Sequence, residues 1–255
     1  MLIAENIHVC IGSLKLADGL SFTLRPGQIT AILGPNGTGK STLLKSLFGD
    51  IPLDSGDIRY ESTTLSKKSL TFWRSRFGYM PQDIHFDISL TVIEVVLLGR
   101  LDSLSLRVDD DMLKEVLVIL NDMGISHLAN RDIRTLSGGQ CQMVLFAQAL
   151  MRNPTIMMLD EPVSALDLHH QHVLLEHLRS KTKEKNYISI MVLHDLNLAA
   201  QYADNLLVLK NGQLAASGAP EAVLNAELIE DIYNVKAQVQ VDPAGTPFVR
   251  TFRAE

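Results

Sequence analysis

The chain has 255 residues, of which 46% are hydrophobic and 20% charged, as in one large globular domain or a domain with an inserted lobe. The net charge of −6 argues against a general nucleic-acid binder. Cys10 and Cys141 have no CxxC partners, so we expect two buried, inert thiols and neither a disulfide framework nor structural zinc. The N-terminus lacks signal-peptide features and no apolar run approaches the ~20 residues that span a bilayer, which indicates a cytoplasmic protein.

Short apolar runs with strand character alternate with helical patterns along the chain. In chain order the expected strands cover 21–24, 29–34, 156–160, 188–194 and 205–212. This alternation predicts βαβ units and a largely parallel sheet, hence an α/β fold. The runs at 29–34 and 155–160 are apolar without alternation, which predicts central strands covered on both faces.

Residues 34–42, GPNGTGKST, satisfy the GxxxxGK[ST] pattern of a phosphate loop. The context fits, because an expected strand precedes the loop and an expected helix, stopped by Gly49, follows it. Glycines let main-chain N–H groups approach phosphate oxygens, Lys40 should reach the β- and γ-phosphates, and the Ser41 hydroxyl should bind Mg²⁺. The candidate nucleotide-binding residues here are Gly34, Pro35, Asn36, Gly37, Thr38, Gly39, Lys40, Ser41 and Thr42.

The region from about residue 83 to 152 carries helical patterns with no clear strand between them, which predicts a helical lobe inserted into the α/β core. Within it, Ser137 and Gln140 have the spacing of a capping box at a helix start. That spacing does not explain Gly138 and Gly139, because each glycine costs a helix about 0.5–1 kcal/mol relative to alanine. Bare main chain at a helix N-terminus does suit close approach to a phosphate.

The apolar run at 156–160 ends in Asp160, and Glu161 follows. Ligands of open α/β sheets bind at the carboxyl ends of the strands. Asp160 is the candidate that holds Mg²⁺, directly or through water, and Glu161 is the candidate base that polarises an attacking water. An acidic turn before Pro162 would be the simpler interpretation of Asp-Glu alone, but the phosphate loop favours the catalytic one.

Several motifs stand in one order along the chain: GPNGTGKS, MPQD with Gln82, LSGGQ at 136–140, IMMLDEP, SALD with Asp167, and VLHD with His194. In this order they resemble the ATP-binding-cassette (ABC) ATPases over nearly the whole sequence. The resemblance implies a P-loop NTPase core with a mostly parallel sheet and an N-terminal antiparallel β part. The core would comprise 1–84 and 153–255, and an α-helical subdomain would comprise 85–152.

The resemblance also implies roles for matching residues, with ATP and Mg²⁺ as cofactors. Gln82 would sense Mg²⁺ and the γ-phosphate, as a metal ligand, and relay that state to a membrane partner. His194 would contact the γ-phosphate and orient the water, and Asp167 would cross the interface of a head-to-tail homodimer. The ATP of the opposite chain would be contacted by Ser137, Gly138, Gly139 and Gln140.

Four stretches, at 91–100, 136–150, 164–171 and 192–204, resemble the ATPases of importers for iron chelates, haem and cobalamin. This implies transmembrane permease subunits, a solute-binding protein outside the membrane as an indirect partner, and a place on the inner face of the cell membrane. Zinc and manganese importers share a stretch like 91–100, so they remain an alternative. A soluble ABC ATPase would have a split or doubled cassette, and a kinase or GTPase has no use for LSGGQ.

The sequence departs from the family at two places. Ile11 matches the position of an aromatic residue that stacks on adenine, and it offers apolar contact without a ring face. Cys141 replaces a polar residue after LSGGQ, and its thiol is either a small packed group or, with a lowered pKa at a helix N-terminus, a redox group. A histidine group could bind metal but is more simply a solvated helix face; it comprises His169, His170, His172 and His177.

Overall fold

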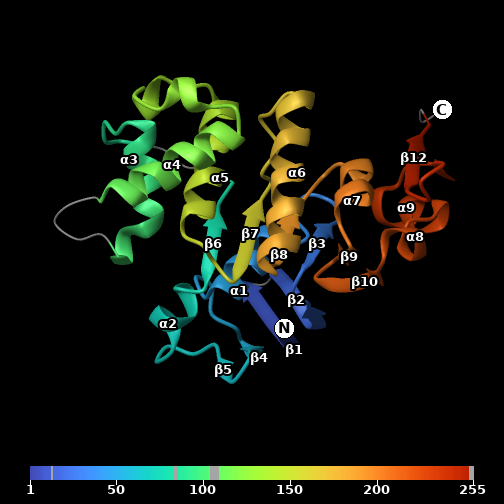
Figure 1. Ribbon diagram of the computed structural model, residues 1–255. Helices are drawn as coiled ribbons and strands as arrows, with labels where there is room; N and C mark the ends of the chain where they lie inside the picture. The colour runs from blue at the N-terminus through green and yellow to red at the C-terminus, as the bar shows by residue number, and fades with distance from the viewer. Residues whose placement is uncertain (13, 83–85, 104–108, 253–255) are drawn as a thin grey trace.

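Two β-sheets share an apolar core with one helix, and a group of helices lies beside them (Figure 1). The structure is a computed structural model that describes residues 1–12, 14–82, 86–103 and 109–252. Within those ranges, no helix is both long enough and apolar enough to cross a membrane.

The larger sheet has six strands in the spatial order β10–β9–β3–β8–β7–β6. In that order they span Gln213–Gly218, Asn205–Lys210, Gln28–Leu33, Ile188–Val192, Ile156–Asp160 and Phe77–Met80. All pairings are parallel except β9 with β10, as expected of βαβ units. β7 is buried along its whole length and β3 at every residue after the first, which confirms that both are covered on two faces.

The smaller sheet is antiparallel and is built mainly from the N-terminus, in the order β2–β1–β4–β5. Its strands span Leu14–Leu24, Leu2–Ile11, Ser55–Tyr60 and Thr63–Thr64. α1 (Lys40–Phe48) packs Leu43, Leu44 and Leu47 into a cluster shared with both sheets. α1 ends at Gly49, whose left-handed φ of 84° confirms the predicted stop.

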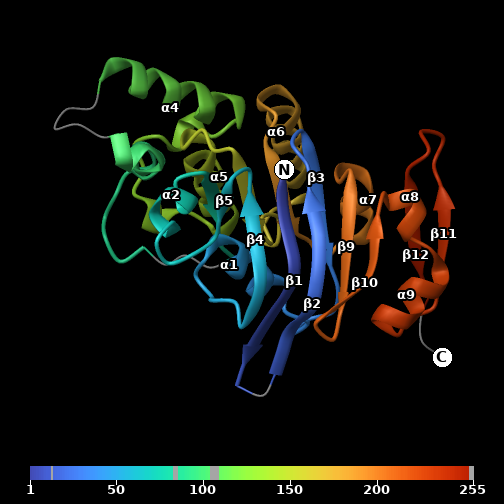
Figure 2. The ribbon, with the colours of Figure 1, turned by 90° about the horizontal axis from the view of Figure 1, so that it is seen from below.

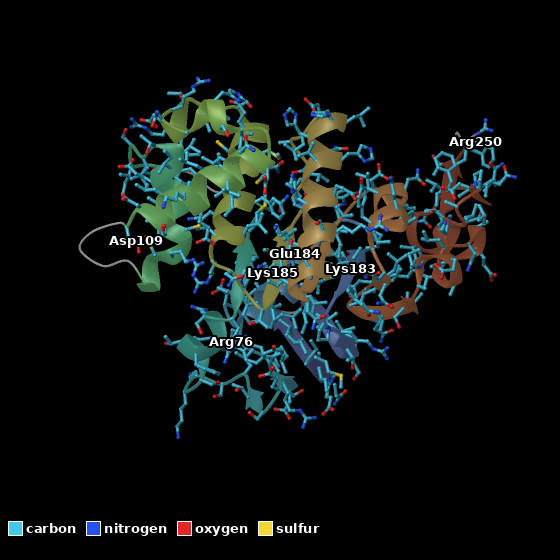
Figure 3. All side chains as sticks on the ribbon, in the orientation of Figure 1. Arg76, Asp109, Lys183, Glu184, Lys185 and Arg250 are labelled. Carbon is cyan, nitrogen blue, oxygen red and sulfur yellow. The ribbon has the colours of Figure 1, made fainter. Side chains whose placement is uncertain are left out.

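The two faces of the larger sheet are covered by different helices because strand side chains alternate. Ile156 and Met158 of β7 pack in the cluster that contains α1, whereas Met157 and Leu159 pack with α6 and α7 on the other face. α6 and α7 span Leu168–Lys185 and Leu196–Tyr202. α6 ends at Asn186 with Lys183 and Lys185 in its last turn (Figure 3), where cations favour the helix dipole.

The predicted helical lobe contains α3, α4 and α5, which span Val92–Leu97, Asp110–Asp122 and Gly138–Met151. Short 3₁₀ helices lie between them at Leu98–Ser103, Ser126–Leu128 and Ile133–Thr135. Over the described residues of 86–152 there is no strand, only a single bridge between Thr91 and Asp132. The boundary predicted between 84 and 85 falls outside the described residues, so the division into core and subdomain remains our proposal.

The C-terminal part adds two short helices and a hairpin beside α7 (Figure 2). The two helices are α8 (Pro220–Val223) and α9 (Ala226–Tyr233), and the hairpin consists of β11 (Ala237–Val241) and β12 (Pro247–Thr251). Earlier in the chain, α2 (Leu70–Arg74) lies between β5 and β6. The Asn197 side chain on α7 holds the hairpin, because its amide donates to the Val249 carbonyl at 3.2 Å and accepts the Val249 N–H at 2.7 Å. The β11–β12 hairpin is thereby anchored to the helix that follows His194.

The expectation of two buried cysteines is wrong. Cys10 is exposed, because it lies near the end of β1 where the β1–β2 hairpin projects into solvent, and Cys141 is only partly buried. Trp73 is a packing residue, with 2% of its surface exposed and its Nε1 donating to the Leu47 carbonyl at 2.9 Å.

Candidate active site

The phosphate loop connects the carboxyl end of β3 to α1, and its backbone requires glycine. Gly34, Gly37 and Gly39 have φ values of 145°, 80° and 93°. A Cβ at Gly34 would lie 2.4 Å from the Leu209 carbonyl oxygen, and one at Gly39 would lie 2.5 Å from the Leu16 carbonyl oxygen. The loop is therefore shaped by backbone conformation and by close contact with neighbouring strands.

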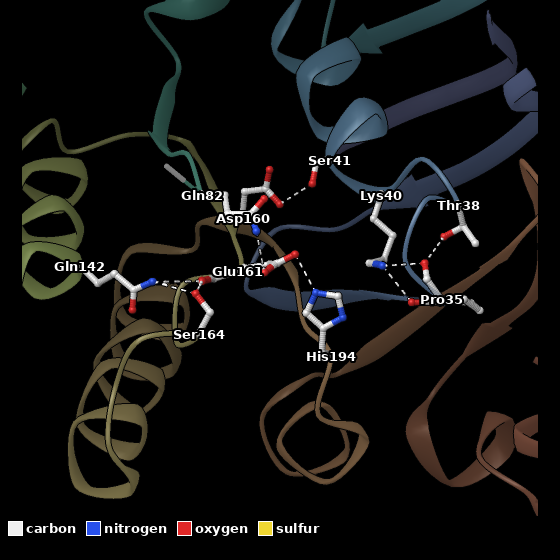
Figure 4. Close-up of polar contacts among 11 residues, drawn as sticks. Pro35, Thr38, Lys40, Ser41, Gln82, Gln142, Asp160, Glu161, Ser164 and His194 are labelled. Atoms are coloured by element: carbon white, nitrogen blue, oxygen red, sulfur yellow. Dashed lines mark hydrogen bonds and ion pairs between the residues drawn. The ribbon is translucent and has the colours of Figure 1, made fainter. Parts of the chain in front are cut away.

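Lys40 places its ammonium group inside this loop (Figure 4). Its Nζ donates to the Gly34 and Pro35 carbonyls at 2.8 and 2.9 Å, and the Thr38 hydroxyl also donates to Pro35 at 2.9 Å. Burial lowers the pKa of Lys40, while the nearby charges of Glu161 and Asp160 oppose that shift. A positive charge held in a glycine-rich loop just before a helix N-terminus suits a polyphosphate.

Asp160 and Ser41 meet at the edge of the larger sheet. The Ser41 hydroxyl donates to Asp160 Oδ1 at 2.9 Å, and Asp160 is 1% exposed. Burial raises the pKa of Asp160, and the Ser41 hydrogen bond opposes the shift. Hydroxyl and carboxylate oxygens are the ligands that Mg²⁺ takes together with substrate phosphates and water, so these residues fit Mg²⁺. The described residues contain no group of three or more His, Cys, Asp or Glu that could hold a metal alone.

Glu161 joins three segments that end at the same edge of the sheet (Figure 4). Its Oε1 is 2.6 Å from His194 Nε2 after β8, and its Oε2 accepts from Gln82 Nε2, after β6, at 2.9 Å. Glu161 itself has a left-handed φ of 51°. Such a backbone is uncommon for a non-glycine residue and typically marks a site that the surrounding structure constrains.

These groups line one cavity of about 460 Å³, which we call the nucleotide cavity. Its polar lining comes from predicted residues, namely Asn36, Gly37, Gly39, Lys40, Ser41, Thr42, Gln82, Glu161 and His194. The apolar wall is formed by Leu14 and Leu16 of β2. Ile11 is 54% exposed and lies opposite Leu14 in the β1–β2 register, outside the cavity lining. Its contact with adenine remains a prediction, and Leu14 is a candidate that sequence reasoning missed.

The signature turn, Ser137–Gln140, begins α5 with the predicted capping box. Ser137 Oγ accepts the Gln140 N–H at 3.3 Å, and Gln140 Oε1 accepts the Ser137 N–H at 3.1 Å. The turn lines a second cavity of about 460 Å³, the signature cavity, together with Asp167 and His170. The signature cavity and the nucleotide cavity share no lining residue.

The two glycines of the signature turn differ in how closely the chain packs against them. A Cβ at Gly138 would meet only the Ala165 Cβ at 3.6 Å, an ordinary contact. A Cβ at Gly139 would lie 2.8 Å from the Ala165 carbonyl oxygen and 3.2 Å from Leu166. Close packing inside this chain therefore requires Gly139, whereas no contact in the described chain requires Gly138.

Asp167 caps α6 and points into the signature cavity. Its Oδ1 accepts the His170 N–H at 2.9 Å and lies 2.8 Å from His170 Nδ1. The hydrogen bond from the His170 main chain, followed by that from its side chain, lowers the pKa of Asp167. Asp167 is therefore a charged group beside the signature turn.

The surroundings of Cys141 do not favour a redox role, and those of the histidine group do not favour metal binding. Burial raises the pKa of Cys141, which opposes the thiolate that a redox group needs. His172 Nδ1 bonds the Tyr202 hydroxyl at 2.7 Å, and His177 Nε2 lies 2.6 Å from the Asp122 carbonyl oxygen. These two histidines bind separate neighbours, which favours packing over a shared metal.

Comparison with known proteins points in the same direction as the geometry. The family model described as ABC transporter matches residues 17–164. The hemin import ATP-binding protein of Hahella chejuensis is 40% identical over 95% of this chain and 96% of its own length. The ferric enterobactin transport ATP-binding protein of Escherichia coli is 38% identical over 96% of this chain and 92% of its own length.

Solved structures show the same fold. An inward-facing ABC transporter of metal-chelate type superimposes with a TM-score of 0.83 at 26% identity, covering 99% of this chain and 97% of that one. A dimeric bacterial ABC transporter cassette gives 0.79 at 25% identity, covering 86% and 99%.

Proposed function

This chain belongs to the ABC transporter family and is an ATP-binding ATPase; from that premise we propose that it powers an importer for a metal chelate such as an iron–siderophore complex, haem or cobalamin. It would act on the inner face of the cell membrane as one of two identical subunits bound to transmembrane permease subunits. A solute-binding protein outside the membrane would be an indirect partner, and no nucleic acid would take part.

One observation supports the dimeric arrangement in this proposal, namely that the predicted site residues line two separate cavities. The nucleotide cavity holds the phosphate loop, Glu161 and His194, and the signature cavity holds the signature turn and Asp167. A second copy, turned head to tail, would place each signature turn on the phosphates held by the opposite chain. The glycine-rich helix N-terminus would then meet a phosphate without any side chain between them.

In the closed dimer the residues of this chain would divide the chemistry. Lys40 and the loop N–H groups would neutralise the phosphates, and Ser41, Asp160 and Gln82 would hold Mg²⁺, which supplies charge neutralisation to the polyphosphate. Glu161 would polarise the attacking water, and His194 would orient it from beside Glu161 Oε1. Gln82 and His194 each bond one oxygen of the Glu161 carboxylate, and each oxygen keeps a second lone pair with which it could accept the water.

A groove between the larger sheet and the helical lobe is the proposed permease contact. Its cavity of about 310 Å³ is lined by Phe48, Phe77, Tyr79, Pro81, Leu98, Gly99, Gln148, Ala149 and Arg152. The Tyr79 hydroxyl is buried, and no hydrogen-bond partner for it lies among the described residues, so a docked segment that offers an acceptor would satisfy it. Gln82 follows Pro81, so this groove adjoins a segment that contacts Glu161.

The metal-chelate substrate is supported by the relatives rather than by a pocket in this chain. A hemin import protein and a ferric enterobactin transport protein match it almost equally well, at 40% and 38% identity. The solute would be recognised by the membrane subunits and the capture protein. A zinc or manganese importer remains the second candidate, because such proteins share a stretch like 91–100.

The decisive experiment is to isolate the chain with its permease in lipid vesicles and add the capture protein loaded with different solutes. We expect hemin, a ferric siderophore or cobalamin to stimulate ATP turnover, with free Zn²⁺ and Mn²⁺ as controls. Stimulation by Zn²⁺ or Mn²⁺ alone would replace the chelate assignment by the second candidate. A purified chain that does not hydrolyse ATP under any condition would contradict the wider proposal.

A further inference from the structure

Gln142 is a buried polar residue on α5 that the proposed reaction does not use. It lies just after the signature turn and is 7% exposed. Its Nε2 donates to Ser164 Oγ at 2.9 Å and to the Glu161 carbonyl at 3.5 Å, and its Oε1 accepts the Ala165 N–H at 3.1 Å (Figure 4). One side chain thus joins the helix of the signature turn to the segment that begins with the proposed base.

The Glu161–Asp167 segment runs from the nucleotide cavity to the signature cavity. Its first turn is closed by Ser164, whose N–H and hydroxyl both reach the Glu161 carbonyl, at 3.3 and 3.1 Å. From α6, Gln171 Nε2 donates to the Val163 and Leu166 carbonyls at 3.2 and 3.1 Å. The segment is therefore held by a glutamine from each of two helices, and Gln142 is the one that reaches Glu161.

The packing of Gly139 provides a second contact between α5 and this segment. The absence of a Cβ there lets the first turn of α5 approach the Ala165 carbonyl, while the Ala165 N–H bonds Gln142. Both polar groups of the Ala165 peptide region thus face α5. A shift of the signature turn would carry Gln142 with it, because both lie on one continuous helix.

We propose that Gln142 is a positioning residue: it fixes the backbone of Glu161 relative to α5, so that the base of one ATP site is set by the helix whose N-terminus serves the other. This inference rests on the head-to-tail dimer of the proposed function. It assigns Gln142 to the catalytic site of its own chain, although in sequence it adjoins the turn that serves the opposite site.

The left-handed backbone of Glu161 gives this support a physical reason. Such a φ is uncommon for a non-glycine residue and costs energy that neighbouring contacts offset, and the Gln142 amide bonds the carbonyl of that residue. Gln142→Met keeps the length of the side chain but removes every hydrogen bond, leaving the Ala165 N–H without its partner. The carboxylate should then lose its alignment with the water, and misplacement of about 1 Å lowers turnover by up to about 100-fold.

The test uses two full-length copies joined by a long flexible linker, one of which carries Glu161→Gln so that a single site turns over ATP. Gln142→Met is placed either in the copy with the intact Glu161 or in the copy with Glu161→Gln. We expect at least about a 10-fold loss of kcat in the first fusion, a several-fold smaller loss in the second, and little change in the KM for ATP.

Thr182→Val is the matched control in both fusions. Thr182 is also fully buried and hydrogen-bonded, to the Leu178 carbonyl at 2.6 Å and the Ser189 hydroxyl at 2.7 Å, but it lies near the far end of α6. Thermal unfolding checks that the two variants lose comparable stability, and Thr182→Val should lower kcat equally in both arrangements. Ser164→Ala, which keeps the Ala165 contact, should reproduce part of the asymmetry.

Equal losses of kcat in the two fusions would overturn the proposal, because they would indicate a general packing defect. A larger loss in the Glu161→Gln copy would also overturn it, since Gln142 would then act on the signature turn and the opposite site. A parent fusion without Gln142→Met that has no ATP turnover would instead contradict the dimer proposal, so the two failures are distinguishable.

Discussion

The phosphate loop and the signature turn both place glycines at the start of a helix, but for different physical reasons. In the phosphate loop Gly34, Gly37 and Gly39 have positive φ values, and two of them pack against main-chain oxygens of neighbouring strands. In the signature turn Gly138 and Gly139 have ordinary helical backbone as the first residues of α5. The phosphate loop therefore needs glycine to exist, whereas the signature turn would form with alanine at one of its two positions.

This difference shows what each loop is built for. The phosphate loop is complete within one chain, where the Lys40 ammonium donates to the Gly34 and Pro35 carbonyls of the same loop. Gly138 reduces helix stability without relieving any close contact in the described chain. A residue that lowers stability with no internal benefit is best explained by something outside the chain, and we propose that this is the ATP of a second copy.

The largest expected effect comes from Glu161→Gln, which keeps the shape of the nucleotide cavity but removes the proposed base. The new amide side chain can still reach His194 and Gln82, but it cannot accept a proton, so turnover should fall by about 10²–10⁴-fold. ATP binding should persist, and size-exclusion chromatography with ATP should show a trapped dimer. Normal hydrolysis by this variant would refute the assignment of Glu161, and Lys40→Ala, which should lose binding as well, is the comparison.

The glycine comparison itself is tested by Gly39→Ala and Gly138→Ala. In Gly39→Ala an alanine would have to adopt the left-handed backbone of Gly39, and its Cβ would clash with the Leu16 carbonyl. The variant should therefore lose at least ~1–2 kcal/mol of unfolding free energy and most of its ATP binding. Gly138→Ala should gain about 0.5–1 kcal/mol and yet lower ATP turnover. Chemical denaturation and steady-state kinetics measure both quantities.

Gly139→Asp separates the two functions of the signature turn. Hydrolysis should stop, because a carboxylate would face the opposite phosphates, but the contact with the Ala165 carbonyl also predicts a loss of about 1–3 kcal/mol of stability. The cleaner variant is therefore Gly138→Asp, because a Cβ at Gly138 would meet only the Ala165 Cβ, at 3.6 Å, among the described residues. Full turnover in Gly138→Asp would argue against any phosphate contact at this turn.

Asp160→Asn tests how much folding stability is lost by burying the carboxylate that is proposed to bind Mg²⁺. Because burial raises the pKa of Asp160, the folded chain binds its proton more tightly than the unfolded chain, and stability falls as pH rises from the usual Asp range through the raised value. Without Mg²⁺ or nucleotide, Asp160→Asn should therefore raise Tm at pH 7, and by less at pH 4. It should also weaken Mg²⁺-dependent ATP binding, and a lower Tm at pH 7 would contradict the argument.

The smallest expected effect concerns the wall that receives the nucleobase. Ile11→Tyr should tighten ATP binding about 2- to 10-fold if a ring at this position stacks on adenine. Leu14→Ala should weaken binding, because Leu14 lines the nucleotide cavity. Isothermal titration distinguishes the two, and no gain from Ile11→Tyr together with a loss from Leu14→Ala would move the base contact to Leu14.

The sequence alone determined the features that depend on short-range chemistry. The phosphate loop, the Gly49 stop, the capping box of Ser137 and Gln140 and the apolar central strands follow from local residue patterns, and the structure has each of them. The order of motifs identified the ABC transporter family for the same reason, since each motif is a contiguous run. Local geometry of this kind needs no knowledge of which segments meet.

Only the tertiary structure decided which distant groups act together. Glu161 contacts Gln82 and His194 because the adjacent parallel strands β6, β7 and β8 have their carboxyl ends on the same side of the larger sheet. The exposure of Cys10, the packing need of Gly139 and the bonds of Gln142 likewise depend on neighbours far along the chain. A glutamine in a helix pattern reads as solvent-facing until the Glu161–Asp167 segment folds against it, because burial and hydrogen-bond partners are properties of the packed chain.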